Sequence, residues 1–244
     1  MAKGIYNGKH ILDELKNHVE KCDVAGLYRY AYLNHTDITS DSRERNTEII
    51  AKYLLENTDI LSDIRTITRE KSYDAGHEKI EMDPGSPRNE EQFARSILGD
   101  EYEYLGKIID YQTPLKNVQK DNAGKIDLLA YNESKNILYL IELKYIGNKE
   151  SLLRCILEIE TYSRIVNEDK LMYDFGKKIS NTRDAAIRKA VLVFKDSQPY
   201  RDFHDLSGTN PYTRKLMKIL GIDLLTLNDD GKSIEFCVFH EDIK

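Results

Sequence analysis

Two apolar runs of this chain carry ionisable residues in their interior. The first reads Lys-Ile-Asp-Leu-Leu-Ala over residues 125–130, and the second reads Tyr-Leu-Ile-Glu-Leu-Lys over residues 139–144. Runs of this kind favour β-strands, and an unpaired charge inside a buried strand is costly to desolvate. We therefore expect Asp127, Glu142 and Lys144 to be compensated, either by one another or by a bound cation.

The spacing between the two runs predicts how they pair. If residues 133–136 form a four-residue loop, Asn132 pairs with Ile137 and Asp127 lies opposite Glu142. Directly opposed residues have Cβ atoms about 4.5–5.5 Å apart on one face of the sheet. Two carboxylates this close repel each other and raise one pKa unless a cation neutralises them. The pairing therefore predicts a site for a hard divalent cation.

Mg²⁺ suits such a site because it commonly takes one or two protein carboxylates and leaves its other positions to water and a substrate phosphate. Lys144 lies two residues beyond Glu142 and therefore shares its face. The lysine ammonium would lie beside the metal-bound water, where it orients the nucleophile or helps to deprotonate it. The residues therefore predict hydrolysis of a phosphodiester.

The periodicity of the whole chain predicts an α/β protein in two parts. In the first quarter, apolar residues recur at three- and four-residue steps, which indicates three short amphipathic helices. Asp41 and Glu44 form a capping-box pattern at the start of the third helix. A turn-rich stretch over 82–87 then marks a boundary. We expect a helical N-terminal region over 1–88 and a second domain over 89–244.

The second part has the order αβββαβ, with a helix and a hairpin appended. Helical periodicity, strand-forming runs and the punctuating Asn210, Pro211 and Gly221 support this order. The expected elements are a helix over 89–98, strands over 104–115, 125–131 and 137–145, a helix over 150–166, a strand over 190–194, a helix over 212–220 and a hairpin over 222–239.

These runs and their surroundings resemble the PD-(D/E)xK nuclease superfamily. The resemblance rests on Gly-Lys-Ile-Asp-Leu-Leu over 124–129 and Ile-Glu-Leu-Lys over 141–144, and it covers residues 89–195. It implies a restriction-endonuclease-like fold, a mixed-sheet αβββαβ core flanked by helices. It also implies a Mg²⁺-dependent nuclease, with Mn²⁺ as a substitute cofactor and nucleic acid, DNA above all, as the partner.

The resemblance also implies roles for single residues. Asp127 and Glu142 are metal ligands in this reading, and the backbone carbonyl of Leu143 is a further ligand. Lys144 positions or activates the attacking water and stabilises charge on the phosphate. Asp127, Glu142 and Lys144 are therefore the expected catalytic residues, together with one acidic residue on the helix before the first core strand.

Glu90 is the expected acidic residue on that helix, as a catalytic and metal-binding group. It precedes Phe93, Ala94 and Ile97 by three, four and seven residues, which places it on the inward stripe, whereas Glu91 is rotated by about 100°. The alternative is a first-turn glutamate favoured by the helix dipole.

The helix that follows the second charged run carries further candidates. RecB-like members of the superfamily have Gln-x-x-x-Tyr there, and this chain has Glu158 and Tyr162 at the matching spacing. Arg154 lies four residues before Glu158, so it either pairs with that carboxylate or reaches a nucleic-acid phosphate. The alternative is a helix face that only packs on the sheet.

Charge is distributed unevenly along the chain. The whole chain carries 36 Lys+Arg and 42 Asp+Glu, whereas residues 140–195 hold 11 basic and 8 acidic residues. This local excess predicts contacts with a phosphate backbone, although a solvated surface explains it equally well. The expected nucleic-acid contacts are Arg154, Tyr162, Lys177, Lys178, Arg183, Arg188 and Lys189.

Other classes of protein find little support in the sequence. There is no HExxH pair, no cysteine metal knuckle and no Gly-x-Ser-x-Gly elbow. No signal-peptide core is present, and no apolar stretch approaches the roughly 20 residues of a membrane span. We therefore expect a cytoplasmic protein with no membrane association. Many relatives dimerise to cut both strands, so a homodimer is one expected assembly.

Two other functions are compatible with the same residues. One is a catalytically inactive nucleic-acid-binding or assembly module on the same fold. The other is a structural domain in which Lys144 neutralises Asp127 and Glu142 as a buried ion triad. Only the nuclease requires a divalent ion for turnover.

Overall fold

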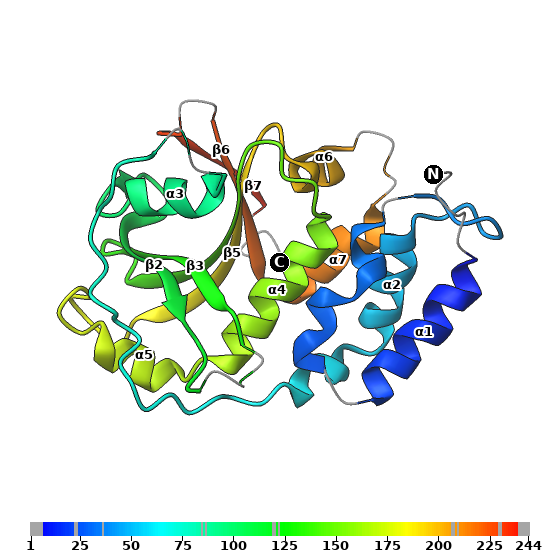
Figure 1. Cartoon of the computed structure of the whole chain (residues 1–244), viewed down its shortest axis with the longest axis horizontal. Coiled ribbons are helices and arrows are strands. Elements are labelled where there is room, and N and C mark those ends of the chain that lie inside the picture. The colour runs from blue at the N-terminus through cyan, green and yellow to red at the C-terminus, as the bar shows by residue number, and fades with distance from the viewer. Residues whose placement is uncertain are drawn as a thin grey trace.

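A mixed sheet of seven strands forms the centre of the structure, and each strand pairs with the next one along the chain. The computed structural model describes residues 7–21, 24–35, 37–83, 85, 87–118, 121, 123–205, 208, 210–228 and 231–238. The N-terminal helices lie on one side of the molecule and the sheet on the other (Figure 1). The chain is therefore a mixed α/β protein, as the pattern predicted.

From residue 89 onward the chain has the predicted helices and strands in the predicted order, with a short strand before the first predicted strand and additional short helices. The strands are β1 (Glu101–Tyr102), β2 (Gly106–Pro114), β3 (Lys125–Asn132), β4 (Ile137–Lys144), β5 (Ala186–Phe194), β6 (Ile222–Leu227) and β7 (Ile234–Val238). The α-helices are α1 (Gly8–Glu20), α2 (Asn46–Glu56), α3 (Asn89–Ser96), α4 (Leu152–Ile165), α5 (Glu168–Asp174), α6 (Gln198–His204) and α7 (Pro211–Ile219). Residue 239, the end of the predicted hairpin, lies outside the described residues.

The sheet contains both antiparallel and parallel strand pairs. Strands β1 to β4 are antiparallel, β5 is parallel to β4, β6 is parallel to β5, and β7 is antiparallel to β6. A parallel pair requires a crossover connection, which α4 and α5 supply before β5 and α6 and α7 supply before β6. The carboxyl ends of β4 and β5 therefore lie at the same edge of the sheet.

The β3–β4 hairpin has the predicted register. Asn132 pairs with Ile137, and the ladder continues to Leu128 with Ile141. Asn136 closes the loop in the left-handed region, at φ 52°, which asparagine tolerates better than most residues. The Asn132 carboxamide accepts from the Lys135 N–H at 3.0 Å, which holds the turn. The loop length read from the sequence is confirmed.

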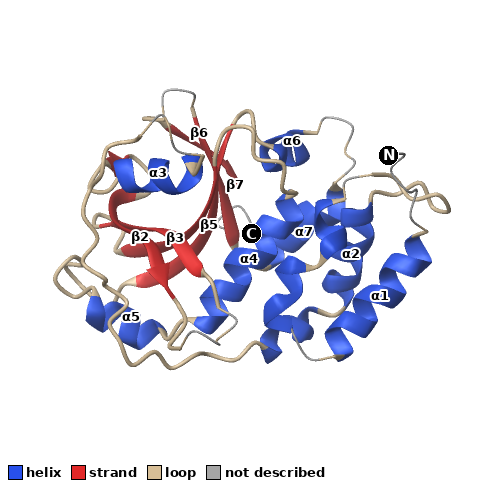
Figure 2. Cartoon of the chain, viewed as in Figure 1, coloured by secondary structure: helices blue, strands red, loops and turns tan. Residues whose placement is uncertain are grey.

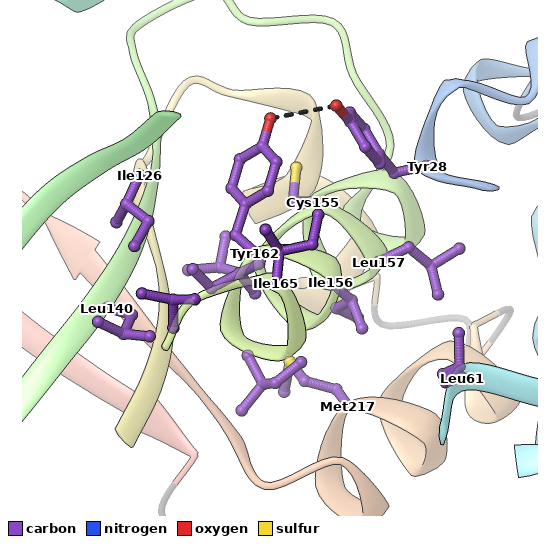
Figure 3. Close-up of a cluster of buried hydrophobic side chains, with 14 of the residues drawn as sticks. Tyr28, Leu61, Ile126, Leu140, Cys155, Ile156, Leu157, Tyr162, Ile165 and Met217 are labelled. Carbon is purple, nitrogen blue, oxygen red and sulfur yellow. Dashed lines mark hydrogen bonds between the residues drawn. The ribbon is translucent and has the colours of Figure 1, made fainter. Parts of the chain in front are cut away.

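Each face of the sheet has its own hydrophobic core. Phe93 and Ile97 of α3 pack on one face with residues of β2 to β6. On the other face, Ile156 and Ile159 of α4 pack with Leu140 of β4 and with the N-terminal helices. Figure 2 shows a strongly curved sheet with α3 and α4 on its two sides, and Figure 3 shows the second core around α4.

The N-terminal region differs from the prediction in two places. The second expected helix is a pair of 3₁₀ turns, η1 (Val24–Arg29) and η2 (Ala31–Asn34), interrupted at Tyr30, whose ψ is 125°. The expected capping box is also wrong, because α2 begins at Asn46 with no side-chain cap. Asp41 instead accepts from the Gly8 N–H at 2.9 Å, so it caps α1 through a contact between distant residues.

Helix α2 is bound to α7 by a buried carboxylate. Glu48 accepts hydrogen bonds from the Tyr212 N–H at 2.6 Å, the Thr213 N–H at 3.1 Å and the Thr213 hydroxyl at 2.5 Å. These are opening donors of α7, whose N-cap residue Asn210 makes no side-chain cap bond. The N-terminal helices also share one hydrophobic core with α4 and the sheet. A domain boundary at residue 88 stays a prediction.

Replacing Glu48 with alanine should lower the free energy of unfolding by about 2–3 kcal/mol, because buried donors at the start of α7 lose their acceptor. Glu56→Ala, at the exposed end of the same helix, should change it by less than about 0.5 kcal/mol. Urea unfolding followed by circular dichroism measures both. Equal effects of the two substitutions would show that Glu48 is not an anchor.

No helix within the described residues is long and apolar enough to cross a bilayer.

Candidate active site

The open end of the β3–β4 hairpin carries the predicted acidic pair. Leu128 with Ile141 is the last registered pair, so Asp127 and Glu142 follow directly at the end of the ladder. Asp127 Oδ2 accepts from the Leu143 N–H at 3.0 Å, which ties the aspartate to β4. Burial, and then repulsion by Asp127, raise the pKa of Glu142 well above its ordinary value. The fold therefore brings the two acids together.

Lys144 is the centre of charge at this site. Its Nζ lies 2.6 Å from Glu142 Oε1 and 2.8 Å from Glu150 Oε2. Glu90 Oε1 and Glu158 Oε2 each lie 3.9 Å from the same nitrogen. Burial favours the neutral amine, but the carboxylates, Glu142 first, outweigh it and hold the pKa of Lys144 well above its usual value. The side chain is 6% exposed and carries a full positive charge.

Glu90 points inward, as its helical phase predicted. Its Oε2 accepts from the Tyr145 N–H at 3.0 Å while its Oε1 faces Lys144. Burial raises the pKa of Glu90, and the lysine opposes that effect. Glu91, one residue further, pairs instead with Arg88 and Arg95 at the surface. The helix therefore directs one of its two adjacent glutamates to the end of β4.

Helix α4 closes the site from the other face of the sheet. The Tyr162 hydroxyl donates to Glu158 Oε1 at 2.8 Å and lies 3.3 Å from the hydroxyl of Tyr28, in η1 (Figure 3). Gly124, just before β3, makes room for this tyrosine, because a Cβ there would clash with the Tyr162 oxygen. Arg154 pairs with Glu150 at 3.0 Å, rather than with Glu158 as the spacing had allowed.

Two residues of the site were not found from the sequence. Gln112 donates from Nε2 to Asp127 Oδ1 at 2.8 Å, and its backbone has a φ of 48°, which is rare for a residue other than glycine. Strained backbone of this kind clusters at functional sites. Periodicity places residue 112 in a strand but reveals nothing of its φ. Glu150 could have been found from the sequence, because it lies four residues before Arg154, which is the spacing of an ion pair on a helix.

Five of the predicted nucleic-acid contacts lie at the far end of the sheet. Arg188 pairs with Tyr139 of β4, five residues before Lys144, which is about 16 Å along a strand. The reason is the parallel pairing, which puts the first half of β5 beside the first half of β4. Lys177, Lys178 and Arg183 precede β5 and share that end.

Three of these basic side chains have acidic neighbours of their own. Lys189 contacts Glu160 at 2.5 Å, Lys178 contacts Asp74 at 3.0 Å, and Arg188 lies 3.9 Å from Asp223. The positive excess that follows the site in sequence therefore does not border it in space. A role of these residues in nucleic-acid binding stays a prediction.

A divalent cation requires several oxygen ligands close together. Within the described part of the chain, no group of three or more His, Cys, Asp or Glu side chains is arranged to hold a metal ion. Lys144 occupies the space between Glu142 and Glu150. However, Glu142 Oε2 is buried and has no hydrogen-bond partner among the described residues. An oxygen left in this state fits a hard cation held by Asp127 and Glu142.

Comparison with known proteins adds no relative. No protein-family model, no curated protein and no solved structure matches the chain.

The acidic pair predicts a pH dependence of stability. Burial raises the pKa of Asp127 to about 7 although Lys144 opposes it, so the folded state binds more protons than the unfolded state between about pH 4 and pH 7. This contribution to stability is complete at low pH and is lost as the pH rises through 7. Asp127→Asn removes it, and the carboxamide introduced by the substitution still pairs with the Leu143 N–H and a flipped Gln112.

In buffer with EDTA, the stability of Asp127→Asn relative to wild type should rise by about 1–2 kcal/mol between pH 5 and pH 7.5, less than the full shift because Asp127 is partly exposed. Urea unfolding at the two pH values measures the difference. Asp13→Asn, on the exposed face of α1, is the control and should change stability equally at both. A relative stability that falls with pH would contradict the assignment.

Proposed function

We propose that this protein is a Mg²⁺-dependent nuclease of the PD-(D/E)xK type, with DNA as the favoured substrate and Mn²⁺ as a substitute metal. The observation that carries the proposal is the convergence of Asp127, Glu142, Lys144 and Glu90 at one end of the sheet. Three of them match the superfamily motif on adjacent strands, and the fourth comes from the preceding helix.

The charge balance supports a cation. Asp127, Glu90, Glu142, Glu150 and Glu158 surround two cations, Lys144 and Arg154, so ionisation of all five acids would leave an excess of three negative charges. The raised pKa values of Asp127, Glu90 and Glu142 oppose that ionisation in the absence of a further cation. Uncompensated charge in a buried place is costly. A divalent ion at this point would lower the free energy of the group.

The residues would divide the work as follows. Asp127, Glu142 and the backbone carbonyl of Leu143 would hold the metal, with Glu90 as a further ligand. The metal supplies a water of lowered pKa and polarises the phosphoryl oxygen. Lys144 would exchange its contact with Glu150 for one with the attacking water and the phosphate. Glu150 is 25% exposed at the mouth of the site and can swing away without burying a new charge.

The architecture also supports the restriction-endonuclease-like assignment. Helix α3, strands β2 to β4, helix α4 and strand β5 follow one another in the order of the αβββαβ core, with the short strand β1 and helix α5 added, and they belong to a mixed sheet. A cytoplasmic location and a homodimer remain predictions from the sequence.

A second candidate has an observation of its own. Lys144 is already in contact with Glu142 and Glu150, and no three-ligand group stands open among the described residues. This arrangement favours an ion network on an inactive nucleic-acid-binding or assembly module. Such a module would bind nucleic acid without any requirement for metal.

A cleavage assay separates the two. Wild type should hydrolyse single-stranded, double-stranded or branched DNA with Mg²⁺ or Mn²⁺ and not with EDTA. Asp127→Ala and Lys144→Ala should lower the rate by roughly two to three orders of magnitude, because each removes a group that acts on the transition state.

Glu91→Ala is the matched control for Glu90→Ala, because the two adjacent glutamates differ in the direction they face. Only the Glu90 variant should lose activity. Equal cleavage by wild type, Asp127→Ala and Lys144→Ala would disprove the nuclease assignment. Metal-independent binding of DNA without cleavage would establish the inactive module.

A further inference from the structure

A cleft beside the site is lined mostly by side chains to which the proposed metal chemistry gives no role. It has a volume of about 420 Å³ and lies between the start of α3 and the loop that follows β4. Glu90 and Gln112 line it, and both also contact the acidic centre. The cleft is therefore continuous with the place where a scissile phosphate would bind.

One side of the cleft is apolar and held in place. Tyr145 packs its ring against Phe93 and Phe194, at centroid distances of 5.6 Å and 5.0 Å, so its orientation is determined by the core. Ile146, the next residue, is 45% exposed. Gly147 follows with a φ of 73° and no atom within 4 Å of the position of a Cβ, so the space beside Ile146 is open. A flat apolar group can lie against this side.

The rest of the lining is rich in carboxamides. Asn89, Gln112 and Asn148 each present donors and acceptors, and Arg88 at the rim is 77% exposed on its side chain. Gln112 uses its Nε2 on Asp127, and Asn148 uses its oxygen on the Glu150 N–H, so each has its other carboxamide atom left for a ligand. Carboxamides recognise the hydrogen-bonding edges of nucleobases, and an arginine recognises phosphate.

This combination matches an unpaired nucleotide. A nucleobase has apolar faces and a polar edge, and both are accessible only when the base is outside a duplex. The volume of the cleft is that of a small-molecule site, about 300–1,000 Å³, and it suits one or two nucleotides of a single strand. A base inside a duplex would first have to leave its stack.

We propose that the cleft between Asn89 and Ile146 binds an unpaired nucleobase next to the scissile phosphate, and that it gives this protein a preference for single-stranded nucleic acid. The inference rests on the proposed function for its position next to a scissile phosphate. The recognised chemistry is the base, which single-stranded DNA and RNA share.

The test measures binding and cleavage separately. Binding of labelled single-stranded DNA, single-stranded RNA and the corresponding duplex is followed by fluorescence anisotropy in EDTA, and hydrolysis of each is followed with Mg²⁺. The variant is Asn89→Ala combined with Ile146→Ser, both exposed positions. The control is Ile219→Ser, which changes another exposed isoleucine at the end of α7. Helix α7 leads into the start of β6, and β6 is parallel to β5 and β4, so Ile219 lies away from the carboxyl ends of those two strands.

Wild type should bind at least one single strand about 10-fold more tightly than the duplex, and the double variant should lose about 10-fold on that strand with an unchanged duplex affinity. Replacing one base of the strand by an abasic site should reproduce the loss in wild type and add nothing in the double variant. The control should behave as wild type, and all variants should keep the wild-type melting temperature.

Equal affinity of wild type for single strand and duplex, or unchanged single-strand binding by the double variant, would overturn the proposal. Its failure is distinct from failure of the nuclease assignment. Base-dependent binding without hydrolysis would support the base-binding cleft and contradict the nuclease assignment. If the double variant retains full hydrolysis and unchanged binding, the nuclease assignment stands and the base-binding cleft is contradicted.

Discussion

The ammonium group of Lys144 holds together three structural elements and the loop between two of them. Carboxylates from α3, from β4 itself, from the residue before the N-cap of α4, and from the body of α4 all face one nitrogen. Without it, these acids would repel one another in a place that water barely reaches. The same ammonium therefore stabilises the packing of two helices on opposite faces of the sheet and gathers acidic oxygens at the proposed metal site.

The N-terminal helices are more than an appendage to this arrangement. The Tyr28 hydroxyl contacts the Tyr162 hydroxyl, which also donates to Glu158. Gly124, three residues before Asp127, leaves the space that the Tyr162 ring occupies. On the far side, Glu48 completes the start of α7. The region that the sequence leaves without a motif is thus connected to the site by a short chain of buried polar contacts.

The opposing roles of Lys144 explain why two functions fit one geometry. In the arrangement observed, the lysine neutralises acids, and as a catalyst it would have to face a water molecule and a phosphate. Under the proposed function, Glu150 is the partner that changes between these roles, because it belongs to no strand or helix and its side chain is 25% exposed. A ligand that draws Glu150 away leaves the lysine beside Glu142, at the mouth of a cleft with apolar and carboxamide walls.

Much of this site was determined by the sequence itself. The hairpin register follows from a loop of known length, the shared face of Glu142 and Lys144 follows from the period of a strand, and the inward direction of Glu90 follows from the period of a helix. Each is a local property, because it depends only on the geometry of one element. The element order αβββαβ was predicted for the same reason.

Contacts between distant segments were decided only by the tertiary structure. Asp41 was expected to cap the helix nearest in sequence but caps α1. The basic residues near β5 lie at the opposite end of the sheet from Lys144, because the parallel crossover returns the chain to the start of β4. Gln112 reached Asp127 through a backbone conformation that its residue type disfavours. Periodicity describes which way a side chain faces within its own element. Which element it meets depends on how the whole chain packs, because burial and hydrogen bonding are satisfied over the fold and not segment by segment.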